Sequence, residues 1–264
     1  QSIDLRGNAL GTEGWCAIFN ALCDNEANQI ESWDLSEQGI VWDPQITKAL
    51  AEYVSGCAVL TECNVRGNKL DSESAHTLAK AATGKGVMLF GIKHDQTEAN
   101  FHSQYLEPAD GILIASDLRV SAVLIVTDLR FNNLDTESAT LLATIAKEKG
   151  VSLCGIKPDQ TEANLQGKPG LRMGPLDAIL LTADLAVRAV LTNLNLADNN
   201  LCGGKYGGKY DASGIQALSD ALASGRAELT SLDISSNNLG ALADQFYIKA
   251  TEVEGDSKEV GAKV

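Results

Sequence analysis

Hydrophobic residues recur along the chain in a short pattern that alternates with helix-like segments. In the most regular copy, Leu191, Leu194, Leu196 and Leu201 surround Asn199. Apolar residues spaced two apart predict a short strand with one buried face. The asparagine amide can satisfy backbone groups that the following turn leaves unpaired. We therefore predict a strand that ends in a turn and leads into a helix.

The same pattern occurs in eight copies, which predicts an array of repeats. The central inward residues of the copies are Leu5, Leu35, Val65, Ile92, Leu129, Ile156, Leu196 and Ile234. Between the copies, apolar residues three and four positions apart predict helices, among them one from about Pro108 to Val120 and one near Pro175 to Val187. Three copies replace the asparagine, with Gln38, Asp95 and Asp159.

A longer repetition is superimposed on this array. Residues 66–130 resemble residues 130–197, which indicates that a unit of two repeats was duplicated. The stretch Asp-Gln-Thr-Glu-Ala-Asn, at residues 95–100 and 159–164, is identical in both halves and is predicted to be a loop. These loops are either twin functional sites or the result of common ancestry and a shared structural role.

The repeated signature, with a helix after each copy, resembles leucine-rich repeat proteins of the ribonuclease-inhibitor type over about residues 1–240. The Asp-Gln-Thr-Glu-Ala-Asn and Gly-Lys-Tyr stretches are similar to those of long, divergent repeat proteins in dinoflagellate and related protist genomes. The resemblance implies an α/β solenoid that is curved, with parallel strands on its concave face and helices on its convex face. It also implies protein binding.

The two ends of the chain differ from this repeat. Residues 241–264 form a divergent C-terminal segment, which we interpret as the start of an insertion. Residue 1 already falls inside a repeat, so we expect the domain to be truncated at its N-terminal end.

Composition narrows the possible partners. The net charge is -14, and an acidic chain is unsuited to general binding of nucleic acid. No apolar run approaches the roughly 18–20 residues of a membrane span, so no membrane insertion is expected. The six cysteines have no metal-ligand spacing. We interpret them as buried free thiols in a reducing, intracellular compartment such as the cytoplasm.

Charged side chains follow the strands in two columns, on the side that the core does not use. An acidic column contains Asp4, Asp34, Asp128 and Asp233, and a basic column contains Arg6, Arg66, Lys93, Arg130 and Lys157, with Phe131 beside it. One interpretation is mutual pairing across neighbouring strands. The other is a recognition surface anchored by Arg6, Arg66, Arg130 and Phe131. For the surface as a whole we favour binding of a protein partner.

A glycine-rich insertion spans Gly203 to Tyr210. It approaches the phosphate-binding pattern G-x-x-x-x-G-K-[ST], but Tyr210 stands where a magnesium-binding hydroxyl is required. We therefore expect a surface loop in which Tyr206 and Tyr210 touch a partner. The three histidines lack ligand spacing, and no nucleophile has a recognisable context, so we expect no metal, no cofactor and no catalysis.

These observations favour a non-enzymatic protein–protein interaction scaffold that presents a charged concave surface. Two alternatives stay open. One is a structural or accessory subunit of a large assembly. The other is a regulator of an enzyme, for example a GTPase activator.

Overall fold

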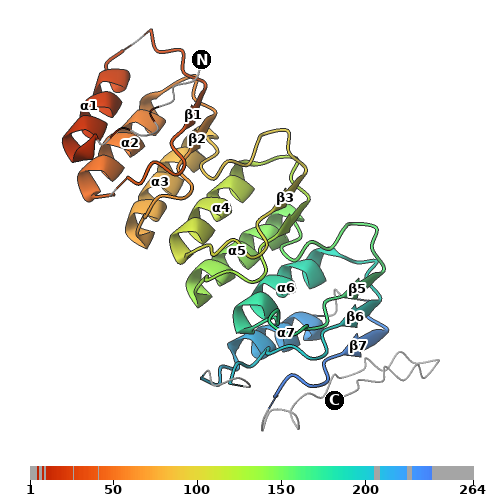
Figure 1. Ribbon diagram of the computed structural model, residues 1–264. Coiled ribbons are helices and arrows are strands. Elements are labelled where there is room, and N and C mark those ends of the chain that lie inside the picture. The colour runs from red at the N-terminus through yellow and green to blue at the C-terminus, as the bar shows by residue number, and fades with distance from the viewer. Residues whose placement is uncertain are drawn as a thin grey trace. The chain divides into compact units, whose positions relative to one another are not determined.

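A computed structural model describes residues 5, 8, 10–25, 27–40, 42–204, 209–224 and 228–239. Seven helices alternate with seven short strands in this part of the chain (Figure 1). The helices are α1 (Gly11–Cys23), α2 (Pro44–Gly56), α3 (Ser72–Lys85), α4 (Pro108–Val120), α5 (Thr136–Lys149), α6 (Pro175–Val187) and α7 (Ser213–Ala223). The strands are β1 (Ser32–Asp34), β2 (Glu62–Asn64), β3 (Glu98–Asn100), β4 (Val126–Asp128), β5 (Glu162–Asn164), β6 (Asn193–Asn195) and β7 (Ser231–Asp233).

The named strands pair in parallel within small sheets. One sheet joins β1 to β2, a second joins β3 to β4, and a third has the order β5-β6-β7. The register places inward residues opposite one another, for example Trp33 opposite Cys63 and Leu194 opposite Leu232. The predicted alternation of strands and helices is therefore confirmed as a mixed α/β architecture.

The chain divides into two compact units. Unit 1 contains residues 1–97 and 107–124, and unit 2 contains residues 98–106 and those from 125 onward. In unit 1, α1, α2, α3 and α4 pack side by side in chain order, and in unit 2, α5, α6 and α7 do the same. No helix in the described ranges is long and apolar enough to cross a bilayer.

The predicted helical faces form the cores of these units. In unit 1 the ring of Phe19 meets Trp33 at 5.4 Å between centroids, and Trp33 meets Tyr53 at 5.7 Å, both edge to face. Such contacts add specific geometry to the burial of apolar area. Helix α2 begins as expected, because the Asp43 carboxylate accepts hydrogen bonds from the amides of Gln45 and Ile46 at 2.8 and 3.0 Å.

Asparagine side chains join neighbouring repeats through the backbone. The Asn199 amide donates to the carbonyls of Leu196 at 2.9 Å and Leu165 at 2.8 Å, and its oxygen accepts from the amide of Met173 at 2.9 Å. Asn68, Asn132 and Asn237 donate in the same way to their own repeat and the preceding one. This confirms the role predicted for the asparagine of the signature. We call these four residues the asparagine ladder.

The strands of the fourth and sixth predicted copies do not lie where the sequence pattern predicted them. Their inward residues Ile92 and Ile156 are buried, but the preceding segments make only isolated bridges. Met88 bridges Glu62, Ser152 bridges Val126, and Cys154 bridges Asp128. The strands β3 and β5 instead lie within the two Asp-Gln-Thr-Glu-Ala-Asn stretches, which were predicted to be loops. Asp95 and Asp159 are exposed and do not occupy ladder positions.

Two buried carboxylates explain where this pairing stops. Asp117 of α4 accepts hydrogen bonds from the amides of Leu89 and Phe90 at 2.6 and 2.9 Å. At the duplicated position, Asp184 of α6 accepts from the amides of Leu153 and Cys154 at 3.0 and 3.1 Å. Because these carboxylates satisfy the amides, the chain can leave the sheet without burying unpaired N–H groups. The duplicated unit therefore includes a buried carboxylate that binds backbone amides, a feature that the hydrophobic periodicity does not reveal.

The carboxyl group of Asp117 makes the free energy of unfolding depend on pH. Burial raises the pKa of Asp117 from 3.8 to about 7, against the opposing hydrogen bonds from Leu89 and Phe90. Between about pH 4 and pH 7 the folded chain therefore holds a proton that the unfolded chain has released. The stability that Asp117 contributes is complete below pH 4 and is lost as the pH rises through 7.

We expect Asp117→Asn to flatten the decrease in the free energy of unfolding between pH 5 and pH 8, by about 2–3 kcal/mol. Urea titrations at several pH values measure this slope independently of any constant loss from the missing acceptor. Asp184→Asn should remove a decrease that ends near pH 6, because burial raises the pKa of Asp184 to about 6. Profiles that stay parallel to the wild type would contradict both assignments.

Candidate functional site

Each strand ends in the same kind of turn. The last strand residue is Asp or Asn, and its side-chain oxygen accepts a hydrogen bond from the amide two residues later. The seven residues are Asp34, Asn64, Asn100, Asp128, Asn164, Asn195 and Asp233, with distances of 2.9–3.2 Å. We call the four residues that start at each of these positions a strand-end turn. The described members of the predicted acidic column, Asp34, Asp128 and Asp233, therefore fix the backbone of their turns. Asp4 of that column lies outside the described residues.

The fourth residue of a strand-end turn adopts a left-handed backbone in most copies. The φ angle is 72° at Gly67 and 54–61° at Glu37, Ser103, Phe131, Asp198 and Ser236. Glycine accepts this conformation freely, whereas a bulky side chain is strained there. Phe131 is the bulkiest residue of this set, and the duplicated turn carries Gly67 at the same place.

The predicted basic column is described from Arg66 onward, because Arg6 lies outside the described residues. The guanidinium of Arg130 donates to both oxygens of Asp128, from Nε at 2.9 Å and from Nη2 at 2.5 Å. Lys93 pairs with Glu62, and Lys157 pairs with Glu98 at 3.4 Å. Pairing across neighbouring segments is thus present for the two lysines, but their partners are glutamates and not the acidic column.

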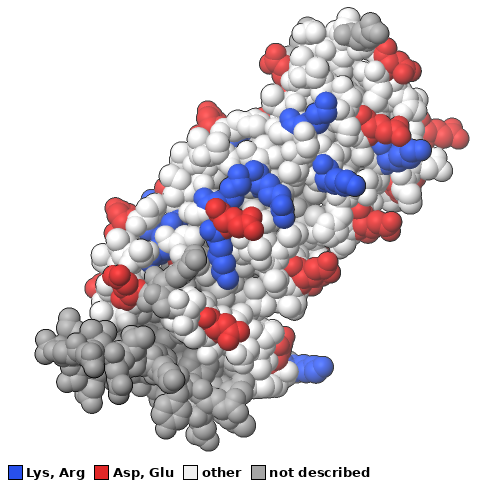
Figure 2. All heavy atoms as spheres, turned by 180° about the vertical axis from the view of Figure 1, so that it is seen from behind, with Lys and Arg blue, Asp and Glu red and all other residues white. Residues whose placement is uncertain are grey.

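The two lysines stay accessible despite their pairing, whereas the Arg130 side chain is only 17% exposed. The lysine side chains are 55% and 59% exposed, at Lys93 and Lys157 respectively. The guanidinium of Arg66 lies 5.6 Å from the centre of the Phe90 ring in unit 1. Figure 2 shows basic and acidic side chains interspersed over one face of the molecule.

An aromatic cluster surrounds Phe131 in unit 2. The His102 ring meets the Phe131 ring at 4.9 Å and 67°, and the guanidinium carbon of Arg130 lies 5.9 Å from its centre. Tyr105, in the same loop as His102, is 81% exposed. Arg130 and Phe131 were predicted from the sequence, whereas His102 and Tyr105 were not. Because residues 95–100 were interpreted as a loop, β3 and the turn after it were not placed beside Phe131.

The glycine-rich insertion is described only at its ends, and Tyr206 lies outside the described residues. Gly203 and Tyr210 form an antiparallel bridge that closes the base of the insertion. The Tyr210 hydroxyl donates to the carbonyl of Leu239 at 3.1 Å, while the side chain stays 43% exposed. Tyr210 therefore ties the insertion to the last described repeat, a structural contact that the sequence prediction of partner binding did not include.

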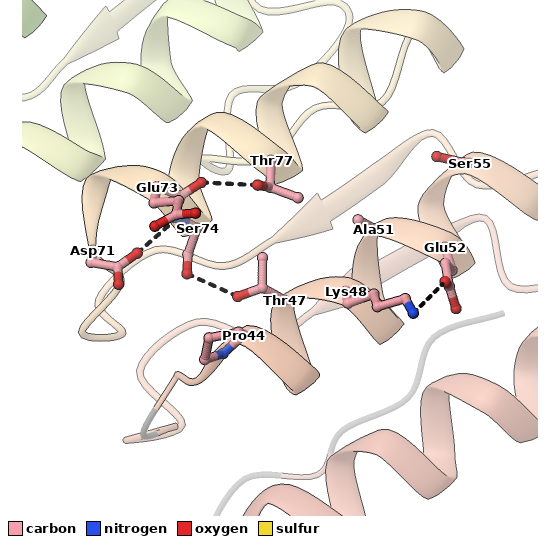
Figure 3. Close-up of a pocket in the computed structure, with 10 residues that line it drawn as sticks. All are labelled: Pro44, Thr47, Lys48, Ala51, Glu52, Ser55, Asp71, Glu73, Ser74 and Thr77. Carbon is pink, nitrogen blue, oxygen red and sulfur yellow. Dashed lines mark hydrogen bonds and ion pairs between the residues drawn. The ribbon is translucent and has the colours of Figure 1, made fainter.

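A groove runs along the outer surfaces of α2 and α3 in unit 1 (Figure 3). It measures about 310 Å³, and Thr47 donates to the Ser74 hydroxyl at 2.9 Å on its floor. Lys48 and Glu52 form an ion pair at 3.8 Å along one wall. These groups pair with one another, and the groove does not bring together a nucleophile with a base.

Metal-binding and nucleophilic groups are also dispersed. No cluster of three or more metal-ligating side chains occurs among the residues that the structure describes. His76 and His94 are exposed, and the ring of His94 contacts the carbonyl of Thr61 at 3.1 Å. Of the cysteines, Cys63 and Cys154 are buried as predicted, whereas Cys23 is exposed, which contradicts a uniform set of buried thiols.

The geometry thus gives strand-end turns with fixed charged and aromatic side chains as the candidate site. No protein-family model matches the chain, and no curated protein does so either.

Proposed function

We propose that the chain is a leucine-rich repeat solenoid of the ribonuclease-inhibitor type. The alternation of helices with parallel strands supports this assignment. The asparagine ladder supports it further, because Asn132 and Asn199 donate to the carbonyls of two successive repeats. Stacked units that contact only their neighbours are the defining property of such repeats.

We propose that the protein is a non-enzymatic scaffold that binds a protein partner through its strand-end turns. The observation that carries this proposal is the fixation of each turn by its own Asp or Asn side chain. Arg66, Arg130 and Phe131 therefore project from backbone that is already ordered. Binding by such groups loses little conformational entropy, so more of the contact energy appears as affinity.

Reversing the charge of three basic side chains in or near the strand-end turns tests this proposal. We expect the triple variant Arg66→Glu, Lys93→Glu and Lys157→Glu to bind its partner at least about tenfold more weakly. Charged side chains at a protein–protein interface set the rate of association and the specificity of binding. The partner is obtained by affinity capture from native extract and identified by mass spectrometry. Its dissociation constant for each variant is then measured by surface plasmon resonance.

The control reverses three lysines on the helical side, Lys48, Lys80 and Lys85, all of which are exposed. This control changes the net charge of the protein by the same amount and should keep wild-type affinity. Equal loss in both triple variants would indicate a general charge effect. Unchanged binding by the strand-end variant would show that the partner uses another surface.

A further inference from the structure

We propose that the groove between α2 and α3 binds an amphipathic helix of a partner protein, acidic at its N-terminus and basic at its C-terminus, which lies antiparallel to α3. The groove belongs to unit 1 and lies on the helical side of the repeats. The inference goes beyond the proposed function, because it concerns a second surface and a second ligand.

Two adjoining hollows make up this groove. The first is the hollow of about 310 Å³ described above, and Ser55 and Thr77 are among the residues that line it. The second also measures about 310 Å³, shares these two residues and includes Gly84 and Lys85. Glu73 and Lys85 are twelve positions apart in α3, which corresponds to about 18 Å along the helix axis. A partner helix of roughly three to four turns therefore spans the groove.

Small side chains open the groove between its two helical walls. Ala51 of α2 and Ala81 of α3 are half-buried along it. In the duplicated helix α5, Leu141 and Ile145 stand at the positions of Thr77 and Ala81. Both walls are helices, so a docked segment finds no strand edge to extend, and a helix whose side chains fill the groove is the matching shape.

The two ends of the groove carry opposite charge. Asp71 and Glu73 lie at the N-terminal end of α3, and Lys80 and Lys85 lie in its second half. All four residues are exposed. Figure 3 shows the acidic end, where Asp71 and Glu73 face the start of α2 across the groove. A ligand that complements both ends must itself be basic at one end and acidic at the other.

The other charged side chains in the groove leave this polarity unchanged. Lys48 and Glu52 neutralise each other in an ion pair at 3.8 Å. The carboxylate of Asp71 accepts a hydrogen bond from the Ser74 amide at 2.7 Å, and this bond lowers the pKa of Asp71. Asp71 therefore keeps its negative charge in mildly acidic solution.

The helix dipole selects the orientation of the ligand. Acidic residues in the first turn and basic residues in the last turn stabilise a helix, because they complement the partial charges of its ends. Such a helix brings its acidic N-terminus to Lys80 and Lys85, and its basic C-terminus to Asp71 and Glu73, only when it runs antiparallel to α3. The charges that stabilise the ligand helix are thus the charges that the groove attracts.

Selection from a phage-displayed library of randomised four-turn helices tests the proposal with the purified full chain. Counterselection uses the double variant Thr77→Leu and Ala81→Ile, which fills the groove with the residues of the duplicated helix. We expect the selected helices to carry Asp or Glu in the first turn and Lys or Arg in the last. The double variant Lys80→Glu and Lys85→Glu should weaken their binding at least about tenfold in surface plasmon resonance.

The matched control is the double variant Lys147→Glu and Lys149→Glu, which changes the net charge equally at the exposed end of α5. This control should keep wild-type affinity for the selected helices, and so should the strand-end variant described above. The proposal is overturned if no selected helix distinguishes the open groove from the filled one. A consensus of opposite or no polarity, or unchanged binding by the Lys80 and Lys85 variant, would also overturn it. Because the strand-end variant leaves the groove intact, its effect on the captured partner tests the proposed function separately.

Discussion

Replacing Asn199 with alanine is expected to lower the free energy of unfolding by about 2–4 kcal/mol. The side chain is fully buried and makes three hydrogen bonds to backbone groups, at Leu165, Met173 and Leu196. Alanine leaves the Leu165 carbonyl and the Met173 amide without this partner in an apolar interior, while the Leu196 carbonyl keeps the hydrogen bond from Asn237. Chemical unfolding followed by circular dichroism measures the loss.

Two further variants separate this effect from simple truncation. Asn199→Asp should destabilise at least as much, because a carboxylate would face the carbonyl oxygens that the amide now binds. Asn193→Ala, on β6 of the same repeat, removes a partly exposed amide that donates to Glu162, and should cost less than about 0.5 kcal/mol. A small effect at both positions would show that the ladder does not stabilise the stack.

Replacing Arg188 with methionine is expected to cost about 3–5 kcal/mol. Arg188 is 4% exposed and lies directly after α6. Its guanidinium donates to the carbonyl of Ile156 at 2.9 Å, to that of Ile125 at 2.8 Å and to that of Gly150 at 3.4 Å. Methionine keeps much of the length but no donor, so three segments of unit 2 lose the group that joins them.

The loss of Arg188 should also change the pKa of Asp184. The positive charge of Arg188 opposes the effect of burial on the pKa of Asp184, so that pKa should rise further in the variant. Arg119→Met, at an exposed position in the last turn of α4, serves as the control and should stay within about 0.5 kcal/mol of the wild type. Comparable losses at Arg119 and Arg188 would contradict a specific role for the buried guanidinium.

The duplicated halves differ at this point. The position that corresponds to Arg188 is Ser121, whose hydroxyl accepts a hydrogen bond from the amide of Leu124 at 3.1 Å. This serine contact lies within its own turn, whereas the arginine joins three segments. The two copies therefore keep the same helices and strands while they use different means to close the loop after the helix.

The sequence alone predicted the helix bounds, the buried positions and the role of the signature asparagine, because these depend on residues close together in the chain. The predicted helix from Pro108 to Val120 and the one from Pro175 to Val187 agree with α4 and α6, because proline favours the first turn of a helix. The inward residues of the described copies are buried, apart from the partly exposed Leu5. Asn199 has the predicted role, because its spacing from Leu196 places the amide beside the carbonyls that the turn leaves free.

The candidate site was predicted in part. Arg66, Lys93, Arg130, Phe131 and Lys157 lie in or just after strand-like segments, and each is accessible to some degree. Their ion pairs could not be predicted, because the lysines reach Glu62 and Glu98 on neighbouring segments. His102 and Tyr105 were missed, since the contact of His102 with Phe131 and the attachment of the Tyr105 turn to Asn132 both depend on the position of β3.

Tertiary structure alone decided where β3 and β5 lie. The copies around Ile92 and Ile156 keep the inward apolar positions of the strand signature, although Asp95 and Asp159 replace its asparagine. The choice is made by Asp117 and Asp184, which belong to helices about thirty residues further along the chain. Their carboxylates take the amides that a continuing strand would have paired, and a buried amide needs an acceptor from whichever segment supplies it. Hydrophobic periodicity indicates which side chains are buried, but it does not indicate which groups form hydrogen bonds with the backbone amides.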